Sequence, residues 1–379
     1  MKRTLYILAL GTFGIGTTEF GVIGILPQIA SAFSVTIDKA GWLLSSFALT
    51  VAIFGPFVML LLSSINKKKL MLFVLGIFAI SNIMSVFANS FSFLLIARIL
   101  PAFLHPVFWS IALALAANTL PDNQSSKGVA IVFGGFTLAC VFGIPLATFM
   151  ATLFNWQSSF ILCAIINVLS FIGVLLFLPS TLIVEKQTIG SQSKILKKPV
   201  FWINFILSFL MIAAMYSIYG YMADFLGKIT GMNGMQISYT LLIFGISGVG
   251  GNWLAGRFLS KNVLTTILVF IIALLIVHVL LFFYGFYYIP MLLLVMVWGF
   301  VHTSGFLISN VNLTSSAPES AEFINSIFTT CGNSAVTFGT LLGGYFIYHF
   351  EIKYIIWSSV ILLVTALIFW FLKRFSSFK

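Results

Sequence analysis

Long apolar runs alternate with short polar connections along the whole chain. Twelve runs are about 19 residues or longer, which is the length a helix needs to cross a hydrocarbon core about 30 Å thick. They lie near residues 4–30, 41–64, 70–89, 92–118, 128–152, 157–179, 200–226, 236–258, 264–285, 288–312, 322–348 and 352–372. Strands of a membrane barrel would show about ten alternating residues each. The pattern therefore predicts an all-α membrane protein with twelve transmembrane helices.

One polar stretch separates the twelve runs into two sets of six. The sixth run ends at Pro179, and the following twenty or so residues are the longest polar stretch in the chain. We therefore expect an N-terminal six-helix bundle over residues 1–179 and a cytoplasmic linker over residues 180–199. A second six-helix bundle is expected over residues 200–379.

An internal repeat supports two similar halves. At an offset of 196, Phe142-Gly143 align with Phe338-Gly339. Both aligned runs carry a small residue at every fourth position: Gly135, Ala139, Gly143, Ala147 and Ala151 in the fifth, and Ala335, Gly339 and Gly343 in the eleventh. Such residues let helix backbones approach closely in lipid. Pro145 removes a backbone hydrogen bond and predicts a kink. Gly143, Pro145, Gly339 and Gly343 are therefore hinge candidates, with plain packing as the alternative.

The composition agrees with a membrane protein and argues against several other classes. Of 379 residues, 60% are hydrophobic and 7% are charged, where a soluble domain has about 25% charged residues. Cys140, Cys163 and Cys331 lie in separate runs without CxxC spacing, so neither a disulfide framework nor a zinc site is predicted. The sequence contains no GxxxxGK[ST] or HExxH motif. We expect no metal, no cofactor and no enzymatic activity, and an ion gradient as the energy source.

The net charge of +11 is distributed as a topology signal. The termini and the even-numbered connections carry fifteen Lys and Arg residues, whereas the odd-numbered connections carry only Lys39, Lys228 and Lys353. The positive-inside rule then places both termini in the cytoplasm of a cell (inner or plasma) membrane. We expect no nucleic-acid partner and a functional monomer. Two short basic cytoplasmic loops, after the second and eighth runs, contain Lys67, Lys68, Lys69 and Arg257.

One acid lies deep inside an apolar run. Glu19 is roughly 20 Å along a helix that begins near Thr4, somewhat past the middle of the core. Acids at such depth face the protein interior or a water-filled cavity and mark an ion pathway or a proton relay. Arg98 and His105 are seven residues apart, so we expect them to share one face of the fourth helix. Trp109 lies on the same face, four residues after His105. Arg98 either holds Glu19 ionised until a proton or substrate displaces it, or neutralises it permanently, or snorkels outward.

Several other polar side chains in the apolar runs could contact a solute. His105 is either a proton relay, because its ordinary pKa is about 6.5, or a hydrogen-bonding partner or substrate ligand. The seventh run carries three tyrosines before Asp224, and they either donate to a ligand or form an aromatic belt. Asp224 is expected to be solvated at the outer end of that span. The substrate-binding candidates are His105, Trp109, Tyr216, Tyr219, His302, Asn310 and Asn333.

Several segments resemble a known transporter family. They are TTEF at 17–20, GILP at 24–27, SSINKKKL at 63–70, ARILPAFLHPVFWSI at 97–111 and GFTLACVFGIPLAT at 135–148, with looser matches through GNWLAGRF at 251–258 and GTLLGG at 339–344. They are similar to the major facilitator superfamily, and within it to the sugar efflux and arabinose-efflux-like branch of the drug/proton antiporters. The chain departs from that branch at Pro106, where a small residue is usual, and at Gln157, where arginine is usual.

The resemblance implies a fold of two six-helix bundles and proton-coupled export by alternating access. Spans one, four, seven and ten would line a central cavity. The acid of span one falls on Glu19, the span-four arginine and histidine on Arg98 and His105, and the glycine-proline signature on Gly143 and Pro145. The predicted pair for proton coupling is Glu19 and Arg98.

Together these features predict a secondary transporter that exchanges protons for a small organic solute, such as a sugar or an amphipathic drug. A proton-coupled uptake symporter is the alternative within transport, because the same carboxylate serves either direction. A passive channel or a membrane sensor is the alternative from another class. A channel would be expected to carry polar stripes along several helices.

Overall fold

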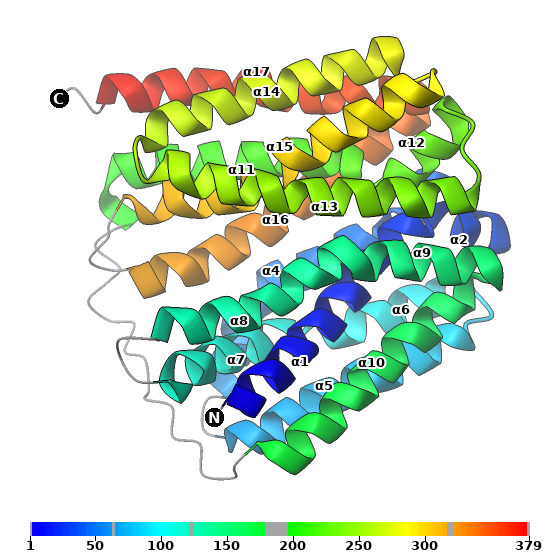
Figure 1. The fold of residues 1–379 in the computed structure, drawn as a ribbon, viewed down its shortest axis with the longest axis vertical. Coiled ribbons are helices and arrows are strands. Elements are labelled where there is room, and N and C mark those ends of the chain that lie inside the picture. Colours follow the sequence, from blue (N-terminus) through cyan, green and yellow to red (C-terminus); the bar gives the residue numbers. More distant parts are fainter. Residues whose placement is uncertain (1, 63–64, 121–124, 179–195, 317–320, 377–379) are drawn as a thin grey trace. The chain divides into compact units, whose positions relative to one another are not determined.

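The computed structural model describes residues 2–62, 65–120, 125–178, 196–316 and 321–376, and its regular structure in these ranges is entirely helical. The elements are α1 (Lys2–Phe20), η1 (Gly21–Gly24), α2 (Leu26–Ala32), α3 (Ile37–Ala40), α4 (Trp42–Leu61), α5 (Lys67–Val86), α6 (Phe91–Ala102), α7 (His105–Thr119), α8 (Ser125–Leu138), η3 (Ala139–Gly143), α9 (Ile144–Leu153), α10 (Trp156–Phe177), α11 (Pro199–Tyr219), α12 (Met222–Ile229), α13 (Gly234–Leu259), α14 (Val263–Tyr284), α15 (Tyr288–Thr314), α16 (Ala321–His349), η6 (Ile352–Tyr354) and α17 (Ile355–Ser376) (Figure 1).

The predicted all-α membrane fold is confirmed. Eleven helical segments within the described ranges are long and apolar enough to cross a membrane. The 29-residue helix α16 lies where the remaining run, near residues 322–348, was predicted. The protein is therefore a multi-pass membrane protein with a twelve-helix architecture.

The first span is interrupted shortly after Glu19. Helix α1 ends at Phe20, the 3-10 turn η1 covers Gly21–Gly24, and α2 begins at Leu26. Glycines favour such a break because they lose more backbone freedom in a helix than other residues. Pro27 lies in the first turn of α2, where its missing N–H costs little. Glu19 is therefore at the end of a helix, where main-chain carbonyls are open to other donors.

The fourth and fifth spans are interrupted as well, each beside a proline. Pro101 lies inside α6 near its end, and Pro106 lies in the first turn of α7, so residues 103–104 separate two helices. In the fifth span the π-helical turn η3 comes just before Pro145. A π turn takes up one extra residue and often marks a functional position. The helix type therefore changes at the position where the sequence predicts a kink.

Contacts divide the described chain into two compact units. Residues 2–35 and 53–178 form the first unit, and residues 36–52 and 196–376 form the second. Most of the predicted linker, residues 180–199, lies outside the described residues, and the bundle boundaries at 179 and 200 stay a prediction.

Residues 36–52 belong to the second unit through close contacts with α16 and with the turn between α11 and α12. The side chain of Tyr221 fills the space beside Gly41, and a Cβ atom on that glycine would collide with the Tyr221 hydroxyl group. The same hydroxyl donates to the carbonyl oxygen of Thr340 at 3.0 Å. Thr337 Oγ1 donates to the carbonyl oxygen of Ser45 at 3.2 Å. Glycine at position 41 is required by this close approach.

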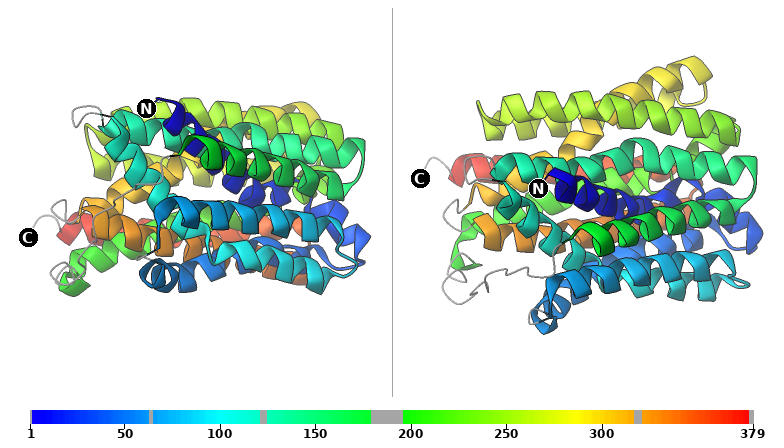
Figure 2. Two further views of the ribbon diagram at one scale, coloured as in Figure 1. Left: turned by 90° about the horizontal axis from the view of Figure 1, so that it is seen from below. Right: turned by 60° about the horizontal axis from the view of Figure 1, so that its bottom comes forward.

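Equivalent helix pairs pack within each unit. In the first unit α1 packs against α8 and α10, and α5 packs against α10; in the second, α11 packs against α16 and α17, and α14 packs against α17. Figure 1 shows α5 and α10 side by side, and the two further views in Figure 2 show the same pair. Each pair recurs six spans later in the chain, which agrees with the internal repeat.

The small-residue faces make the close contacts that their spacing predicts. A Cβ atom on Gly143 would collide with the side chain of Thr17, and one on Gly339 would collide with the carbonyl group of Ala213. The offset of 196 that relates the two glycines also relates Thr17 to Ala213. It relates a second pair of contacts too: Gly21 with Ala147, and Ser217 with Gly343. The repeat therefore extends to individual contacts between spans one and five and between spans seven and eleven.

Candidate functional site

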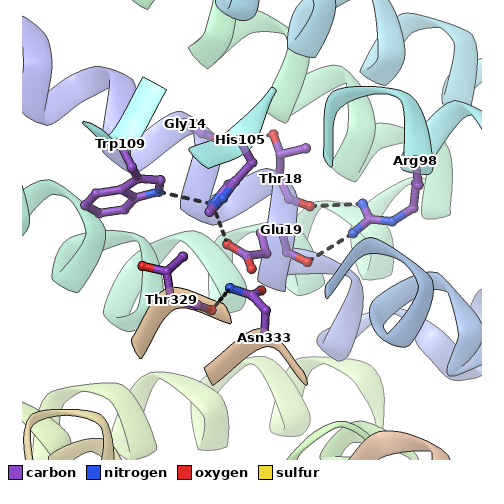
Figure 3. Close-up of polar contacts among 8 residues, drawn as sticks. All are labelled: Gly14, Thr18, Glu19, Arg98, His105, Trp109, Thr329 and Asn333. Carbon is purple, nitrogen blue, oxygen red and sulfur yellow. Dashed lines mark hydrogen bonds and ion pairs between the residues drawn. The ribbon is translucent and has the colours of Figure 1, made fainter. Parts of the chain in front are cut away.

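The carboxylate of Glu19 lies against the imidazole of His105. Oε2 of Glu19 is 3.1 Å from Nε2 of His105, and the two side chains are only 6% and 7% exposed (Figure 3). A buried acid beside a buried imidazole places two groups that can hold the same proton within hydrogen-bonding distance. The sequence named both residues, and the structure brings them together.

Arg98 holds the main chain at the end of α1. Its Nη1 donates to the carbonyl oxygen of Thr18 at 2.9 Å, and its Nη2 donates to the carbonyl oxygen of Glu19 at 3.0 Å (Figure 3). The side chain is buried, so a planar fork of donors meets carbonyls that the helix end has freed. The sequence left open whether Arg98 contacts Glu19. It does, through the backbone, and its positive charge lies close to the carboxylate.

A hydrogen-bonding cluster around Thr18, the residue before Glu19, was missed from the sequence. Thr18 Oγ1 donates to the carbonyl oxygen of Gly14 at 2.9 Å and accepts from Asn82 Nδ2 at 3.2 Å and from Asn167 Nδ2 at 3.0 Å. All of these groups are buried. Asn82 and Asn167 lie inside apolar runs, and that was the signal that could have found them. They fix the rotation of α1 and hence the direction of the adjacent Glu19 side chain.

Trp109 contacts the histidine and an aromatic cluster. Its Nε1 donates to Nε2 of His105 at 3.1 Å. Its ring lies 5.7 Å from the ring of Phe133 and 5.3 Å from that of Phe136, centroid to centroid. Both phenylalanines are on α8, which packs against α1 and α7. The indole is therefore fixed by packing as well as by its hydrogen bond.

The seven-residue spacing predicts that Arg98 and His105 share a face of one helix, but in the structure they lie on two different helices. Arg98 is on α6 and His105 is the first residue of α7, on either side of the break at residues 103–104. The prediction was wrong because two prolines interrupt the span between them. Both side chains still reach residue Glu19, one at its carbonyl and the other at its carboxylate.

A second buried cluster in the other unit contains three of the predicted substrate residues. The ring of Tyr219 lies 4.7 Å from that of His302, and Tyr216 lies 5.7 Å from Tyr219 and 5.9 Å from His302. Phe244 stacks on Tyr219 at 4.9 Å and 16°, and Trp298 packs edge-on against Phe244 at 5.3 Å. The sequence did not point to Phe244 or Trp298, since a lone aromatic residue in an apolar run carries no signal.

Two polar atoms in this aromatic cluster have no hydrogen-bond partner among the described residues. They are His302 Nδ1 and Trp298 Nε1, and both side chains are almost completely buried. A buried polar atom without a partner costs about 1–3 kcal/mol, so such atoms often await a ligand or water. The cluster therefore combines aromatic faces with polar groups that a solute could satisfy.

The remaining predicted residues lie elsewhere. Asn310 Nδ2 donates to Asn325 Oδ1 at 2.8 Å, and Asn333 Nδ2 donates to the carbonyl oxygen of Thr329 at 3.0 Å. Lys67, Lys68 and Lys69 form the first turn of α5, where Asn66 Oδ1 accepts from the Lys69 backbone N–H at 3.2 Å. The Arg257 guanidinium lies 3.7 Å from the ring centroid of Trp253.

Asp224 is buried, and the prediction that it is solvated was wrong. The side chain is 4% exposed and lies 3.1 Å from Nζ of Lys228, which is 58% exposed. Burial raises the pKa of the Asp224 carboxyl, and the nearby Lys228 ammonium lowers it in part. Asp224 is in the first turn of α12, the short helix that follows the span, and the sequence does not show that this helix packs inward. The second unit therefore also has a buried acid.

Comparison with known proteins identifies the family. The family model described as Major Facilitator Superfamily matches residues 8–340. The chain belongs to this superfamily. Superfamily relatives include the inner membrane transport protein YdhP of Escherichia coli, which is 31% identical over 273 residues, covering 72% of this chain and 70% of YdhP. A probable sugar efflux transporter of Helicobacter acinonychis is 29% identical over 367 residues, covering 97% and 94% of the two chains.

Solved structures of other transporters have the same superfamily fold. The nucleoside transporter NupG superposes with a TM-score of 0.79 at 14% identity, covering 98% of both chains. A bacterial homologue of the human lysosomal transporter Spinster superposes with a TM-score of 0.73 at 15% identity, covering 98% of this chain and 96% of the other. At this identity the likeness shows the fold alone. The family-model match confirms the predicted superfamily, and the protein is a membrane transporter of that family.

Proposed function

We propose that this transporter is a proton-coupled exporter and that Glu19 is the residue that carries the proton. The observation that supports this most directly is the buried contact of 3.1 Å between Glu19 Oε2 and His105 Nε2. An ionisable pair inside the membrane is costly, so it is expected where a proton must be bound and released. The charge of Arg98 beside the carboxylate favours release of the proton once the site opens to water.

Alternating access would expose this pair to each side of the membrane in turn. Related transporters rock one repeat against the other around a site near the midplane. Glycines let span five pack closely against α1 and span eleven pack closely against α11. Our candidates for the positions that bend are Gly143, Pro145, Gly339 and Gly343. The turn η3 beside Pro145 already departs from regular α-helix, which supports a bend there.

The proposed solute is a small organic molecule rich in hydroxyl groups, such as a sugar. The aromatic cluster of Tyr216, Tyr219 and His302 offers ring faces for the C–H side of a sugar and polar atoms for its hydroxyls. The names of the Helicobacter relatives, probable sugar efflux transporters, agree with this choice. Asn310 and Asn333 are further candidates, because an amide can both donate and accept. An amphipathic drug is the other solute class to be tested.

The remaining features of the proposal concern topology. By the positive-inside rule, the basic connections support a topology with both termini in the cytoplasm and with Lys67, Lys68, Lys69 and Arg257 in cytoplasmic loops. One chain holds the whole site proposed here, so a monomer suffices. The proposed coupling ion is the proton, and the proposal requires no metal or organic cofactor.

Everted membrane vesicles test both coupling and direction. Respiration acidifies their interior, so an exporter that exchanges protons for solute accumulates the probe inside. The probes are radiolabelled L-arabinose and lactose for the sugar class and ethidium for the amphipathic cations. Accumulation of a sugar that collapses when nigericin dissipates the pH gradient supports the proposal. If acidification of the interior makes preloaded vesicles lose the probe faster, the protein is a symporter. If the rate of probe movement does not depend on the pH gradient, the protein is a channel.

A further inference from the structure

We infer that Trp109 is a positioning residue that keeps the shared proton on Glu19 rather than on His105. This inference deepens the proposed function and rests on it for its consequence in transport, although the proton arrangement itself can be measured separately. It starts from one atom, Nε2 of His105, which lies 3.1 Å from Oε2 of Glu19 and 3.1 Å from Nε1 of Trp109. Figure 3 shows both contacts converging on that nitrogen.

The two contacts make different demands on the nitrogen. The indole N–H of Trp109 is only a donor, so it requires a lone pair on Nε2. An ionised Glu19 is only an acceptor, so it requires a hydrogen on Nε2. An imidazole nitrogen carries a lone pair or a hydrogen in its plane, never both. The indole bond and an ion pair between Glu19 and His105 are therefore mutually exclusive.

The observed arrangement thus corresponds to one protonation state. The proton lies on Oε2 of Glu19, His105 is neutral with its own proton on Nδ1, and the lone pair of Nε2 faces two donors. When the proton moves, the bond to Oε2 breaks and a bond to Nε2 forms. Glu19 becomes a carboxylate, His105 becomes an imidazolium with protons on both nitrogens, and the Trp109 N–H loses its acceptor. No other reactant is needed.

Packing of the Trp109 ring makes the loss of its hydrogen-bond acceptor energetically costly. The half-buried Trp109 ring packs against both Phe133 and Phe136, and this packing limits how far the indole can turn to another acceptor when His105 gains a proton. Losing one hydrogen bond of ordinary strength changes the distribution of the proton between the two residues by about 2- to 10-fold. Trp109 therefore favours the state in which the acid of α1 carries the proton.

Other titratable groups face this pair from the neighbouring elements. Among the described residues they are Arg98 on α6, the thiol of Cys140 in η3 and the thiol of Cys163 on α10. Arg98 is engaged with two main-chain carbonyls and stays a cation. A pH-dependent signal from Trp109 is therefore assigned to His105 by substitution.

The test is fluorine NMR of protein in which the eight tryptophans are replaced by 5-fluorotryptophan. Purified protein is titrated without substrate between about pH 5 and about pH 9. Trp109→Phe assigns the Trp109 resonance, and Trp156→Phe assigns a buried tryptophan of the same unit, which serves as the control. We expect the Trp109 resonance to move in a single step with pH and the Trp156 resonance to stay in place.

His105→Gln supplies the second variant. Glutamine keeps an acceptor for the indole but cannot gain a proton, so the step should disappear while the Trp109 resonance stays dispersed in a folded protein. A Trp109 resonance that does not move with pH, or a step that persists in His105→Gln, would overturn the inference. The result is independent of transport: a step that is lost in His105→Gln, together with normal gradient-driven transport by Glu19→Gln, would refute the proposed function while leaving the proton arrangement established.

Discussion

Arg98 and Glu19 meet through the main chain: Nη2 of the arginine donates to the carbonyl oxygen of Glu19 at 3.0 Å, while the side-chain carboxyl group of Glu19 faces His105. The arginine thus has two effects on one residue. It terminates α1 by binding carbonyls that the helix no longer uses, and it brings a positive charge close to a carboxylate inside the membrane. A lysine would keep the charge but could not form the same two-pronged contact.

Arg98→Lys should therefore lower both stability and transport. A hydrogen bond from a charged group contributes about 1.5–3 kcal/mol, and the variant loses at least one of two such bonds at the end of α1. The checks are thermal unfolding in detergent and gradient-driven accumulation of the sugar probe. The matched variant is Glu19→Gln, which leaves the carbonyl contact in place and should unfold at nearly the wild-type temperature. Equal unfolding temperatures for Arg98→Lys and the wild type would contradict the helix-end role.

Gly339→Ala should be destabilising, whereas Gly256→Ala should not. A Cβ atom at Gly339 would collide with the carbonyl group of Ala213, and relieving such overpacking costs about 1–3 kcal/mol. Gly256 is also helical but has no atom within 4 Å of its would-be Cβ, so alanine there should be neutral or slightly stabilising. Thermal unfolding of the two variants checks this. A similar unfolding temperature for both would show that the contact between α16 and α11 is looser than described.

Asp224 and Lys228 predict a pH-dependent change in stability. Burial raises the pKa of the Asp224 carboxyl above its ordinary value of about 4, and Lys228 partly offsets this. A carboxyl whose pKa is higher in the folded state contributes stability that is complete below the unfolded pKa. That contribution is lost as the pH rises through the folded pKa. Lys228→Met should raise the folded pKa further, so it should destabilise the protein more at about pH 8 than at about pH 5.

The control for this pair is Asp224→Asn. It removes the buried charge and leaves Lys228, which is 58% exposed, in contact with water. We therefore expect Asp224→Asn to be milder than Lys228→Met at about pH 8, because an unpaired exposed charge costs much less than an unpaired buried one. Unfolding temperatures of both variants at the two pH values decide the matter. A larger loss in Asp224→Asn would mean that the carboxylate has another essential partner.

The helices and the small-residue contacts could be predicted because they depend on local patterns. Run length predicts spans, and the spacing of Gly143 and Gly339 predicts close packing in two places related by one offset. The burial of Asp224 could not be predicted, because it depends on how the short helix α12 packs. The separation of Arg98 from His105 follows from Pro101 and Pro106 acting together, which the seven-residue spacing does not reveal.

The sequence indicated which residues make up the candidate site but not which of their atoms contact one another. Glu19, Arg98 and His105 are rare residue types in apolar runs, and rarity alone identifies them. Which atom of each meets which partner depends on where α1 ends, and that is set by Gly21 and the residues after it. Trp109 and the threonine-asparagine cluster around Thr18 depend on neighbouring helices, so their roles come only from the structure.

The measurement that tests the central claim most directly compares wild type and Glu19→Gln in sealed vesicles with an imposed pH gradient. The probe is whichever of L-arabinose, lactose and ethidium the wild type accumulates, and each preparation is also assayed for exchange of labelled against unlabelled probe without a gradient. We predict that Glu19→Gln retains exchange but loses gradient-driven accumulation. Accumulation by Glu19→Gln equal to that of the wild type would contradict the assignment of Glu19 as the proton carrier.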